Sequence, residues 1–402
     1  MNYKNRQELI NEDTWIGAIS RNVRKSSIVA IVIIGTLSGV YGCSSNDIHQ
    51  SENRKSDSKL KDQQIDLLIE NVAGNRKNEL KQAEFVGYHL VNQAKQGATA
   101  QALMEFWHKV KERTEGKLSM TVLPKDAYLP GSDGEAFLNT ANGRFNAITI
   151  NAPALTNVMP QVFNIMTLMF AFKDSNEGLE LTKNKVFRRL LVEAGEEFNV
   201  TFLPNAILNA GMRVVTSTKE YPFKDSSDIK GFKLRIPPSN SIAIQLKSLG
   251  VEPVQTPIGQ LIKTLKSKKA YGQENPPSYI PIFKINTVQN TIWVTNHVWS
   301  GFATGINSDT WNSWPKEWQQ IVREEAKLMQ DAQWKRVAND NKQALKEAPK
   351  TMGMKVMKTN FESLNENESF NQAREEIVKT LDPELQVIAR KIINGTFETG
   401  NN

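Results

Sequence analysis

The chain alternates strand-like and helix-like segments, and this alternation limits the possible folds more than any other feature of the sequence. Strand-like stretches at 85–91, 118–123 and 145–150 are separated by segments with helical periodicity at 100–115 and 135–141. Strand–helix–strand order is typical of α/β proteins, in which parallel strands are joined by right-handed crossovers. The sequence therefore predicts an α/β fold with mixed, mainly parallel sheets flanked by helices.

Further strands are expected in the second half of the chain, at 200–203, 213–217, 233–236 and 291–295. A long helix should begin just after Pro315, because proline suits the first turn of a helix, and its pattern continues to about residue 348. At about 1.5 Å per residue such a helix is about 45 Å long, enough to run along two lobes.

Length and composition agree with two domains that have real cores. The chain has 402 residues, of which 39% are hydrophobic. The formal charge of +7 weakly favours anionic ligands, but basic residues are mixed with nearly as many acids and do not indicate nucleic-acid binding. A local run of lysines, without interleaved aromatic residues, is interpreted as a solvated helix end. It consists of Lys263, Lys266, Lys268 and Lys269.

The N-terminus has the features of a secretory leader. Basic residues precede the apolar run Ile28–Gly39, which is short for a membrane span, and the run leads to Gly42 and Cys43. This arrangement resembles a bacterial lipoprotein cleavage box, with 1–43 as signal peptide and Cys43 as the lipidated residue. An uncleaved short anchor helix is the alternative. Cys43 is the only cysteine, so no internal disulfide can form.

The polar segment 44–81 is rich in Ser, Asn, Lys and Asp. We expect it to be a flexible tether between the membrane surface and a folded domain. Together with the leader, it predicts a periplasmic or extracytoplasmic protein anchored to a membrane.

Common catalytic and cofactor motifs are absent from the sequence. It contains no HExxH, GxSxG, GxxxxGK[ST] or GxGxxG pattern, and its four histidines lie far apart. No metal site and no cofactor are therefore predicted. A dispersed catalytic group remains compatible with the sequence, with Glu135 or His297 as the proton carrier of a cleft enzyme.

Arg235 is the candidate ligand anchor. Lys233–Ile236 alternates like a strand and runs into Pro237 and Pro238, which cannot continue a hydrogen-bonded ladder. Arg235 should therefore lie at a strand end, facing a crevice between elements. An exposed arginine at the strand end, or one in a surface ion pair, is the alternative interpretation of the same residues. Its guanidinium presents five donors in a fixed fork that matches the two oxygens of a carboxylate.

Several segments resemble the solute-binding proteins of tripartite ATP-independent periplasmic (TRAP) transporters. Asp228–Pro238 is similar to the family's DLKGLKIRVP strand, and Gly272–Pro276 to its DGQENP turn. Phe106–Leu118 and Trp311–Trp318 are similar to two helix-associated segments of the family. The resemblance implies a two-lobe periplasmic-binding-protein-like fold with a long helix spanning both lobes.

The resemblance also implies roles for particular residues. Arg235 would grip the carboxylate of an organic acid, and Asn275 would face the same ligand. Arg213 matches a second carboxylate contact. Glu135 matches a helix that can offer a carboxylate to ligand hydroxyl or amino groups, and Asn151 ends the strand where the cleft opens.

From these matches we expect lobe I to comprise 82–209 plus 298–340, and lobe II to comprise 210–297 plus 341–402. The protein would capture an organic acid anion between the lobes and deliver it to a TRAP-type membrane permease. A ligand-sensing lipoprotein without a transport role is a further alternative.

Four positions depart from the family pattern, namely Asn146, Leu208, Gln260 and Tyr271. The dicarboxylate specificity that is usual in the family is therefore not carried over to this chain.

Overall fold

The computed structural model describes residues 63–64, 66–67, 83–124, 133–225, 228–359, 361, 364 and 366–397. The expected signal peptide, with Cys43, lies outside these residues, as does most of the expected tether. Of the tether, Gln63, Gln64, Asp66 and Leu67 are helical, and Asp66 forms a 2.8 Å ion pair with Arg144. None of the described helices is both long and apolar enough to cross a membrane.

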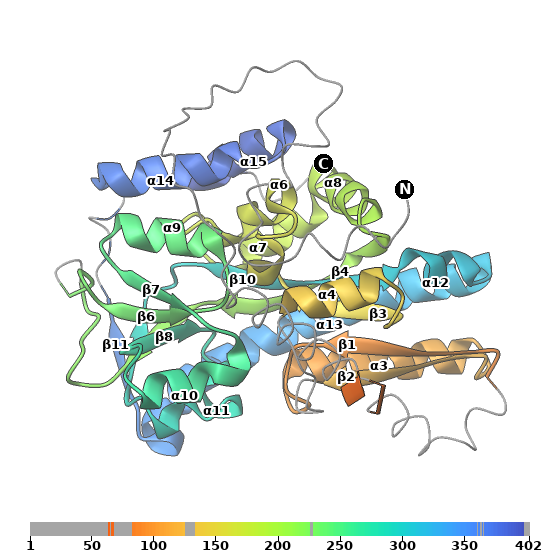
Figure 1. Ribbon diagram of the computed structural model, residues 1–402, viewed down its shortest axis with the longest axis horizontal. Coiled ribbons are helices and arrows are strands. Elements are labelled where there is room, and N and C mark those ends of the chain that lie inside the picture. The colour runs from red at the N-terminus through yellow and green to blue at the C-terminus, as the bar shows by residue number, and fades with distance from the viewer. Residues whose placement is uncertain are drawn as a thin grey trace, which may run out of the picture. The chain divides into compact units, whose positions relative to one another are not determined.

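The first sheet has the strand order β2-β1-β3-β10-β4 (Figure 1). Its strands are β1 (Phe85–Val91), β2 (Leu118–Pro124), β3 (Ala147–Asn151), β4 (Val200–Met212) and β10 (Trp299–Asn307). Strand β1 pairs in parallel with β2 and β3, whereas β10 is antiparallel to both β3 and β4. The sheet is thus mixed, because β10 returns to it from the second half of the chain.

The second sheet has the strand order β11-β9-β5-β8-β6-β7. Its strands are β5 (Val214–Ser217), β6 (Lys233–Ile236), β7 (Glu252–Gln255), β8 (Gly272–Asn275), β9 (Thr291–Val294) and β11 (Lys355–Lys358). The pairs β6–β7, β6–β8 and β9–β11 are parallel, and β5 is antiparallel to β8 and β9.

The central strands of both sheets are buried on both faces, whereas the edge strands β7 and β11 are partly exposed. Successive residues of a strand point to opposite faces, and here they enter different cores: Ile207 packs into one cluster and Leu208 into another. In the second sheet, Val214 and Val215 divide in the same way. Two-sided burial explains why these strands are rich in apolar residues instead of alternating with polar ones.

Helices cover the four faces. One face of the first sheet is covered by α4 (Asp133–Ala141), α5 (Ala152–Leu155), α6 (Pro160–Phe163), η4 (Asn164–Thr167), α7 (Ser175–Lys183), α8 (Lys185–Glu196) and α15 (Pro383–Ile393). Its other face packs against α3 (Ala98–Arg113), α12 (Ser308–Ser313) and α13 (Lys316–Glu347).

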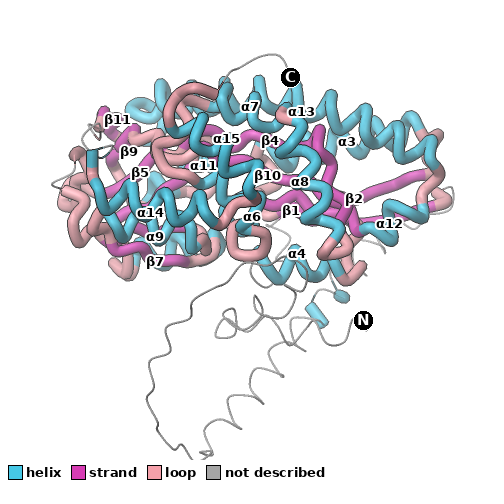
Figure 2. The backbone as a smooth tube through the Cα atoms, turned by 90° about the horizontal axis from the view of Figure 1, so that it is seen from above, coloured by secondary structure: helices cyan, strands magenta, loops and turns pink. Residues whose placement is uncertain are grey.

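The second sheet is covered on one face by α9 (Asn240–Ser248) and α14 (Glu368–Lys379), which Figure 2 shows side by side. The other face carries α10 (Leu261–Lys266), α11 (Tyr279–Ile282), η6 (Ile285–Thr287) and the π-helical turn η7 (Ala348–Met352). The short 3-10 turn η5 (Ile258–Gln260) precedes α10.

Helix α13 joins the two lobes and protects the edge of the first sheet. Its 32 residues begin beside the first sheet, and the chain then continues into the core of the second as η7. Gln330 Oε1 accepts a 2.8 Å hydrogen bond from the backbone of Ile207, and Gln333 both donates to and accepts from the backbone of Asn209. Side chains of the helix thus replace the missing neighbour of edge strand β4.

The chain also crosses between the sheets at two adjacent points. Strand β4 continues into β5 through Arg213, and β9 continues into β10 through 295–298. The backbone N–H of Arg213 donates to Val298 O at 2.8 Å, so the two crossings are hydrogen-bonded to each other. A hinge movement between the lobes would involve these residues, α13 and the passage from α14 to α15 at 380–382.

The predicted α/β, two-lobe architecture with a long connecting helix is confirmed, with three differences in detail. Gly272–Asn275, expected as a turn, is strand β8. Strands β7, β10 and β11 were not predicted. Residues 341–402 were expected in lobe II, but Leu385, Ile388 and Ile392 of α15 pack into the core of the first sheet.

His89 is buried inside the first sheet as a neutral ring. Trp107 Nε1 donates to its Nδ1 at 2.8 Å, and its Nε2 lies 2.9 Å from the hydroxyl of Thr149, which in turn lies 2.8 Å from that of Thr304. Burial lowers the pKa of His89 from 6.5 to about 3, because the charged ring would lose its hydration.

Acid should therefore destabilise the fold through His89. Between pH 6.5 and pH 3 the unfolded chain binds a proton at this ring that the folded chain does not, so stability is intact above pH 6.5 and is lost as the pH falls. The expected slope is about 1.4 kcal/mol per pH unit. Urea unfolding at pH 7, 6, 5 and 4 should show a shallower slope for His89→Asn. His108→Asn, at a side chain that is 67% exposed, is the control; equal slopes in all three proteins would contradict the prediction.

Candidate functional site

A polar cavity opens between the two lobes, with about 410 Å³ of empty space. Lobe I lines it with residues that follow or end β1 and β3, with the start of α4 and with β10. Lobe II contributes the crossing at Arg213, the ends of β6 and β8, and α11. The lining residues are Asn92, Gln93, Asp133, Asn151, Arg213, Arg235, Pro237, Pro238, Ile258, Asn275, Tyr279, Phe283, Ser300 and Phe302.

The position of the cavity follows from the sheet topology. Strands β1 and β3 run parallel and end at Val91 and Asn151, while the parallel strands β6 and β8 end at Ile236 and Asn275. In open α/β sheets the crevice beyond the carboxyl ends of parallel strands is the usual place for a ligand. Here an edge of this kind from each sheet borders the polar cavity.

Arg235 is the most unusual residue of this cavity, because its charge is buried without a neutralising partner. Its side chain is only 1% exposed. Nε donates to Thr256 Oγ1 at 3.2 Å, and Nη2 donates to the backbone oxygen of Thr256. No described carboxylate lies within ion-pair distance. Three of its five N–H groups therefore have no partner among the described residues.

Burial lowers the pKa of Arg235 to about 10. The neighbouring charge of Arg213 acts in the same direction, whereas Glu274 and Asp133 oppose it. The guanidinium is thus still charged at neutral pH, and the missing hydration is a cost that an incoming anion can offset.

Arg213, by contrast, is already neutralised. Its Nε and Nη2 both donate to the carboxylate of Glu274, with an Nη2–Oε1 distance of 2.9 Å, and both side chains are buried. Nη2 also lies within 3.2 Å of Asn275 Oδ1, and Nη1 lies 3.4 Å from Ser300 Oγ. Arg213 therefore offers the cavity a polar edge but little net charge.

Glu274 holds this group together. Burial by itself would raise the pKa of Glu274, but the charge and hydrogen bonds of Arg213, with a contribution from His297, hold that pKa below its usual value. His297 Nε2 lies 3.4 Å from Glu274 Oε2. Because Arg213 and His297 belong to the two adjacent crossings, the carboxylate ties both of them to β8.

The predicted asparagines also line the cavity. Asn275 Nδ2 donates to Gln273 Oε1 at 2.6 Å, which uses one of its two hydrogens and leaves the other for a ligand. Asn151 Oδ1 accepts from Asn92 Nδ2 at 3.2 Å. The two amides therefore come from opposite lobes, and each is held in place by a neighbouring side chain.

Of the five predicted ligand residues, Arg235, Asn275, Arg213 and Asn151 lie together, whereas Glu135 is not among the lining residues. Asp133, two positions earlier on α4, lines the cavity instead.

Sequence reasoning also missed Asn92, Gln93, Asp133 and Tyr279. Asn92 and Gln93 directly follow the first predicted strand, so the rule for the carboxyl ends of strands could have found them. No pattern in the sequence distinguished Asp133 or Tyr279. Burial raises the pKa of the Tyr279 hydroxyl.

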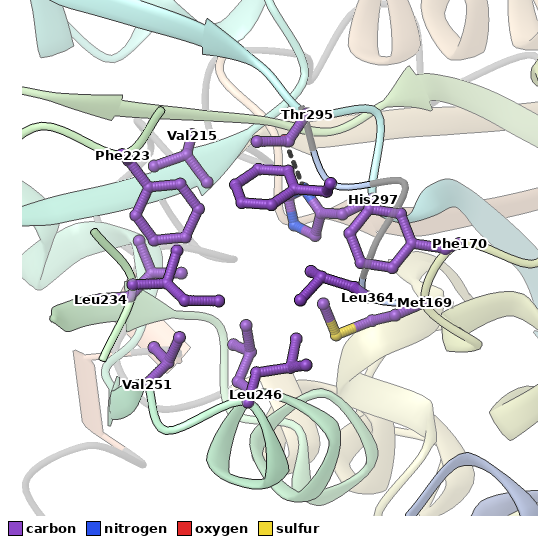
Figure 3. A pocket seen from close by; sticks show the side chains of 13 residues that line it. Met169, Phe170, Val215, Phe223, Leu234, Leu246, Val251, Thr295, His297 and Leu364 are labelled. Carbon is purple, nitrogen blue, oxygen red and sulfur yellow. Dashed lines mark hydrogen bonds between the residues drawn. The ribbon is translucent and has the colours of Figure 1, made fainter. Parts of the chain in front are cut away.

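A second cavity, with about 290 Å³ of empty space, lies within lobe II and is apolar (Figure 3). Phe223, Leu234 and Leu246 point into it, and its polar lining is confined to Thr295 and His297, which are hydrogen-bonded to each other at 2.7 Å. It offers no cation to an anionic ligand. Among the described residues, no group of three or more His, Cys, Asp or Glu side chains could hold a metal ion.

The model of the bacterial extracellular solute-binding proteins, family 7, matches residues 91–382. The chain belongs to this family. Its relatives include the C4-dicarboxylate-binding protein DctB of Bacillus subtilis, which is 25% identical over 74% of this chain and 81% of the relative. The 2,3-diketo-L-gulonate-binding periplasmic protein YiaO of Escherichia coli is 24% identical over 69% of this chain and 82% of the relative.

Solved structures of the family share the fold. A TRAP periplasmic solute binding protein from Xanthobacter autotrophicus, with bound β-D-galacturonate, superposes with a TM-score of 0.68 at 21% identity, covering 77% of this chain and 99% of that chain. One from Sulfurospirillum deleyianum, with bound succinate, has a TM-score of 0.67 at 22% identity, covering 77% and 99%. The folded body described here thus corresponds to nearly the whole of each solved chain.

In the ligand-free protein, removing the counter-ion of Arg213 and removing the charge of Arg235 should have opposite effects on stability. Glu274→Ala leaves Arg213 buried without its counter-ion, which should cost about 3–5 kcal/mol of unfolding free energy. Arg235→Met removes an unneutralised buried charge and puts an unbranched apolar side chain in its place, so the free energy of unfolding should stay equal or rise. Urea unfolding of both variants is the measurement. If Arg235→Met costs as much as Glu274→Ala, the charge of Arg235 is balanced within the protein and our view of the cavity is wrong.

Proposed function

We propose that the cavity binds the carboxylate of an organic acid through Arg235 and closes the two lobes on it, for delivery to a TRAP-type membrane permease. The observation that carries this proposal is the buried guanidinium of Arg235, which has three N–H groups without described partners. A carboxylate placed there would accept two parallel N–H bonds and supply the missing negative charge.

The charges of the described lining favour a ligand with a single carboxylate. Glu274 already neutralises Arg213, so Arg235 is the cation left for the ligand. Asp133 places a carboxylate on the lobe I side of the cavity. The remaining polar groups, among them the amides of Asn92, Gln93 and Asn151, suit hydroxyl or carbonyl oxygens. A monocarboxylate with a neutral polar body, such as a sugar acid, fits these groups better than a dicarboxylate.

The relatives include binders of monocarboxylates and of dicarboxylates, so the preference proposed here rests on the charges of the lining. Solved family members contain β-D-galacturonate or L-gulonate, which combine one carboxylate with several hydroxyls, although another contains succinate. In the enzyme alternative, Glu135 or His297 would carry protons. Neither is among the residues that line the polar cavity, and His297 lines the apolar one (Figure 3). No observation therefore favours that alternative.

Arg235→Lys tests the proposal. A panel of mono- and dicarboxylates is first screened by thermal shift, since a ligand at 100 times its Kd should stabilise the fold by about 2.7 kcal/mol. We expect the strongest stabiliser to be a hydroxylated monocarboxylate. Lysine keeps the charge but loses the fork, so Arg235→Lys should weaken binding of that ligand by about ten- to a hundredfold in calorimetry.

Asn275→Ala is the matched variant, at a neutral donor of the same cavity, and should weaken binding less. Circular dichroism confirms that each variant is folded. Unchanged affinity of Arg235→Lys would remove Arg235 as the anchor. Tightest binding by a dicarboxylate would contradict the charge argument, and turnover of the bound acid would favour an enzyme.

We further propose that the leader before Cys43 is removed, and that Cys43 is then lipidated and anchors the receptor to a membrane. Support comes from the sequence alone: basic residues, the apolar run Ile28–Gly39 and a single cysteine after Gly42. Cys43→Ala should be released in soluble form or remain unprocessed, because attachment requires the acyl chains. Mass spectrometry of the native protein is the measurement, and an intact leader without lipid would exclude the anchor.

A further inference from the structure

One stretch of the chain, most of it in lobe II, carries only positive charge among its exposed side chains. From Pro253 to Ser308 the sequence contains five lysines and a single carboxylate, Glu274, which is buried against Arg213. The lysines of this stretch, Lys263, Lys266, Lys268, Lys269 and Lys284, are all exposed. Every exposed side-chain charge in these 56 residues is therefore positive.

Neighbouring elements extend the same charge. Helix α10, η6, η7 and β11 pack around one hydrophobic cluster, which includes Leu265, Ile285, Ala348 and the partly buried Val356. Their outward sides, with the last turn of α13, carry three more exposed lysines. We call the whole set the basic face, and it consists of Lys263, Lys266, Lys268, Lys269, Lys284, Lys346, Lys350 and Lys355.

These lysines make no ion pairs in the part of the chain that the structure describes. None of the eight forms an ion pair with a described carboxylate, whereas lysines elsewhere do, such as Lys183 with Glu180 at 2.7 Å. Of the nearby acids, Glu347 is half-buried. Charges gathered without counter-ions repel each other, and a surface of opposite charge would relieve this repulsion.

The composition of the basic face distinguishes between kinds of partner. Protein interfaces usually rely on aromatic and arginine anchors, but all eight cations here are lysines. Among the described exposed large apolar side chains, only Met357 belongs to one of these elements. Lysine is a compact, strongly hydrated charge, suited to diffuse attraction by a layer of hydrated headgroups.

We propose that the basic face docks on the surface of a membrane that contains anionic phospholipids. Attraction by several lysines is additive and does not require a shaped pocket. Docking would present lobe II to the bilayer, whether or not the chain also has a lipid anchor. This site is separate from the cavity, so it does not depend on the identity of the ligand.

Two variants with equal change in net charge test the proposal. The first combines Lys263→Gln, Lys266→Gln, Lys268→Asn and Lys269→Gln; asparagine is chosen at 268 because φ there is +57° and asparagine tolerates the left-handed region. The control combines Lys327→Gln, Lys335→Gln, Lys379→Gln and Lys391→Gln, at exposed lysines of α13, α14 and α15. Both are made in the compact unit Ser58–Asn402, which contains the body found alone in the solved relatives.

Co-sedimentation is measured with vesicles of phosphatidylcholine, with and without one part in three of phosphatidylglycerol. We expect the parent to bind the anionic vesicles, and binding to fall as salt rises, because surface attraction is screened. The first variant should bind at least about tenfold more weakly, whereas the control should stay within about threefold of the parent.

Equal binding by the first variant and the parent, or equal loss in both variants, would overturn the proposal. So would binding to uncharged vesicles as strong as to anionic ones. If the parent binds only vesicles that contain the permease, the basic face recognises a protein and the lipid proposal fails. Ligand-induced thermal shifts, measured in parallel, keep this outcome separate from any failure of carboxylate binding.

Discussion

The buried ion pair of Arg213 with Glu274 is the interaction on which the rest of this molecule depends. It lies where β4 passes into β5 and where the returning chain passes from β9 to β10, and it attaches both crossings to the end of β8. The same pair determines the charge of the cavity, because it neutralises one of the two arginines that line it. The joining of the two crossings and the net charge of the cavity therefore both depend on one carboxylate.

Segments with a clear hydrophobic period could be predicted from the sequence. Strand β1 was expected with the bounds it has, and α13 within one or two residues, because period, proline and flanking residues agree at these places. Strand β10 was missed by the sequence analysis because all nine of its residues are buried, so that no alternation of polar and apolar residues marks it. The position of α15 was also unpredictable, since its apolar stripe fits either lobe.

The same division holds for the site. The strand that runs into two prolines indicated a strand-end position for Arg235, and the family resemblance was needed to favour a place at the ligand cavity for Arg235, Asn275 and Arg213. Neither the strand pattern nor the resemblance could reveal that Arg213 is paired with Glu274, whereas Arg235 has no described carboxylate partner. That distinction depends on pairings across 61 residues of sequence, which only the folded chain establishes. The cavity is lined by Asp133 and not by the predicted Glu135 for a similar reason, because the direction of a side chain on α4 depends on where the helix begins.

The glutamines of α13 do more than attach this helix to the first sheet. An open strand edge is a template on which another chain can add a strand, and β4 is the outermost described strand of its sheet. Gln330 and Gln333 occupy backbone groups of that edge with side chains of the same molecule. The helix that connects the lobes thus also closes this edge to strand addition by another chain, and this protection lasts only while α13 stays in register with β4.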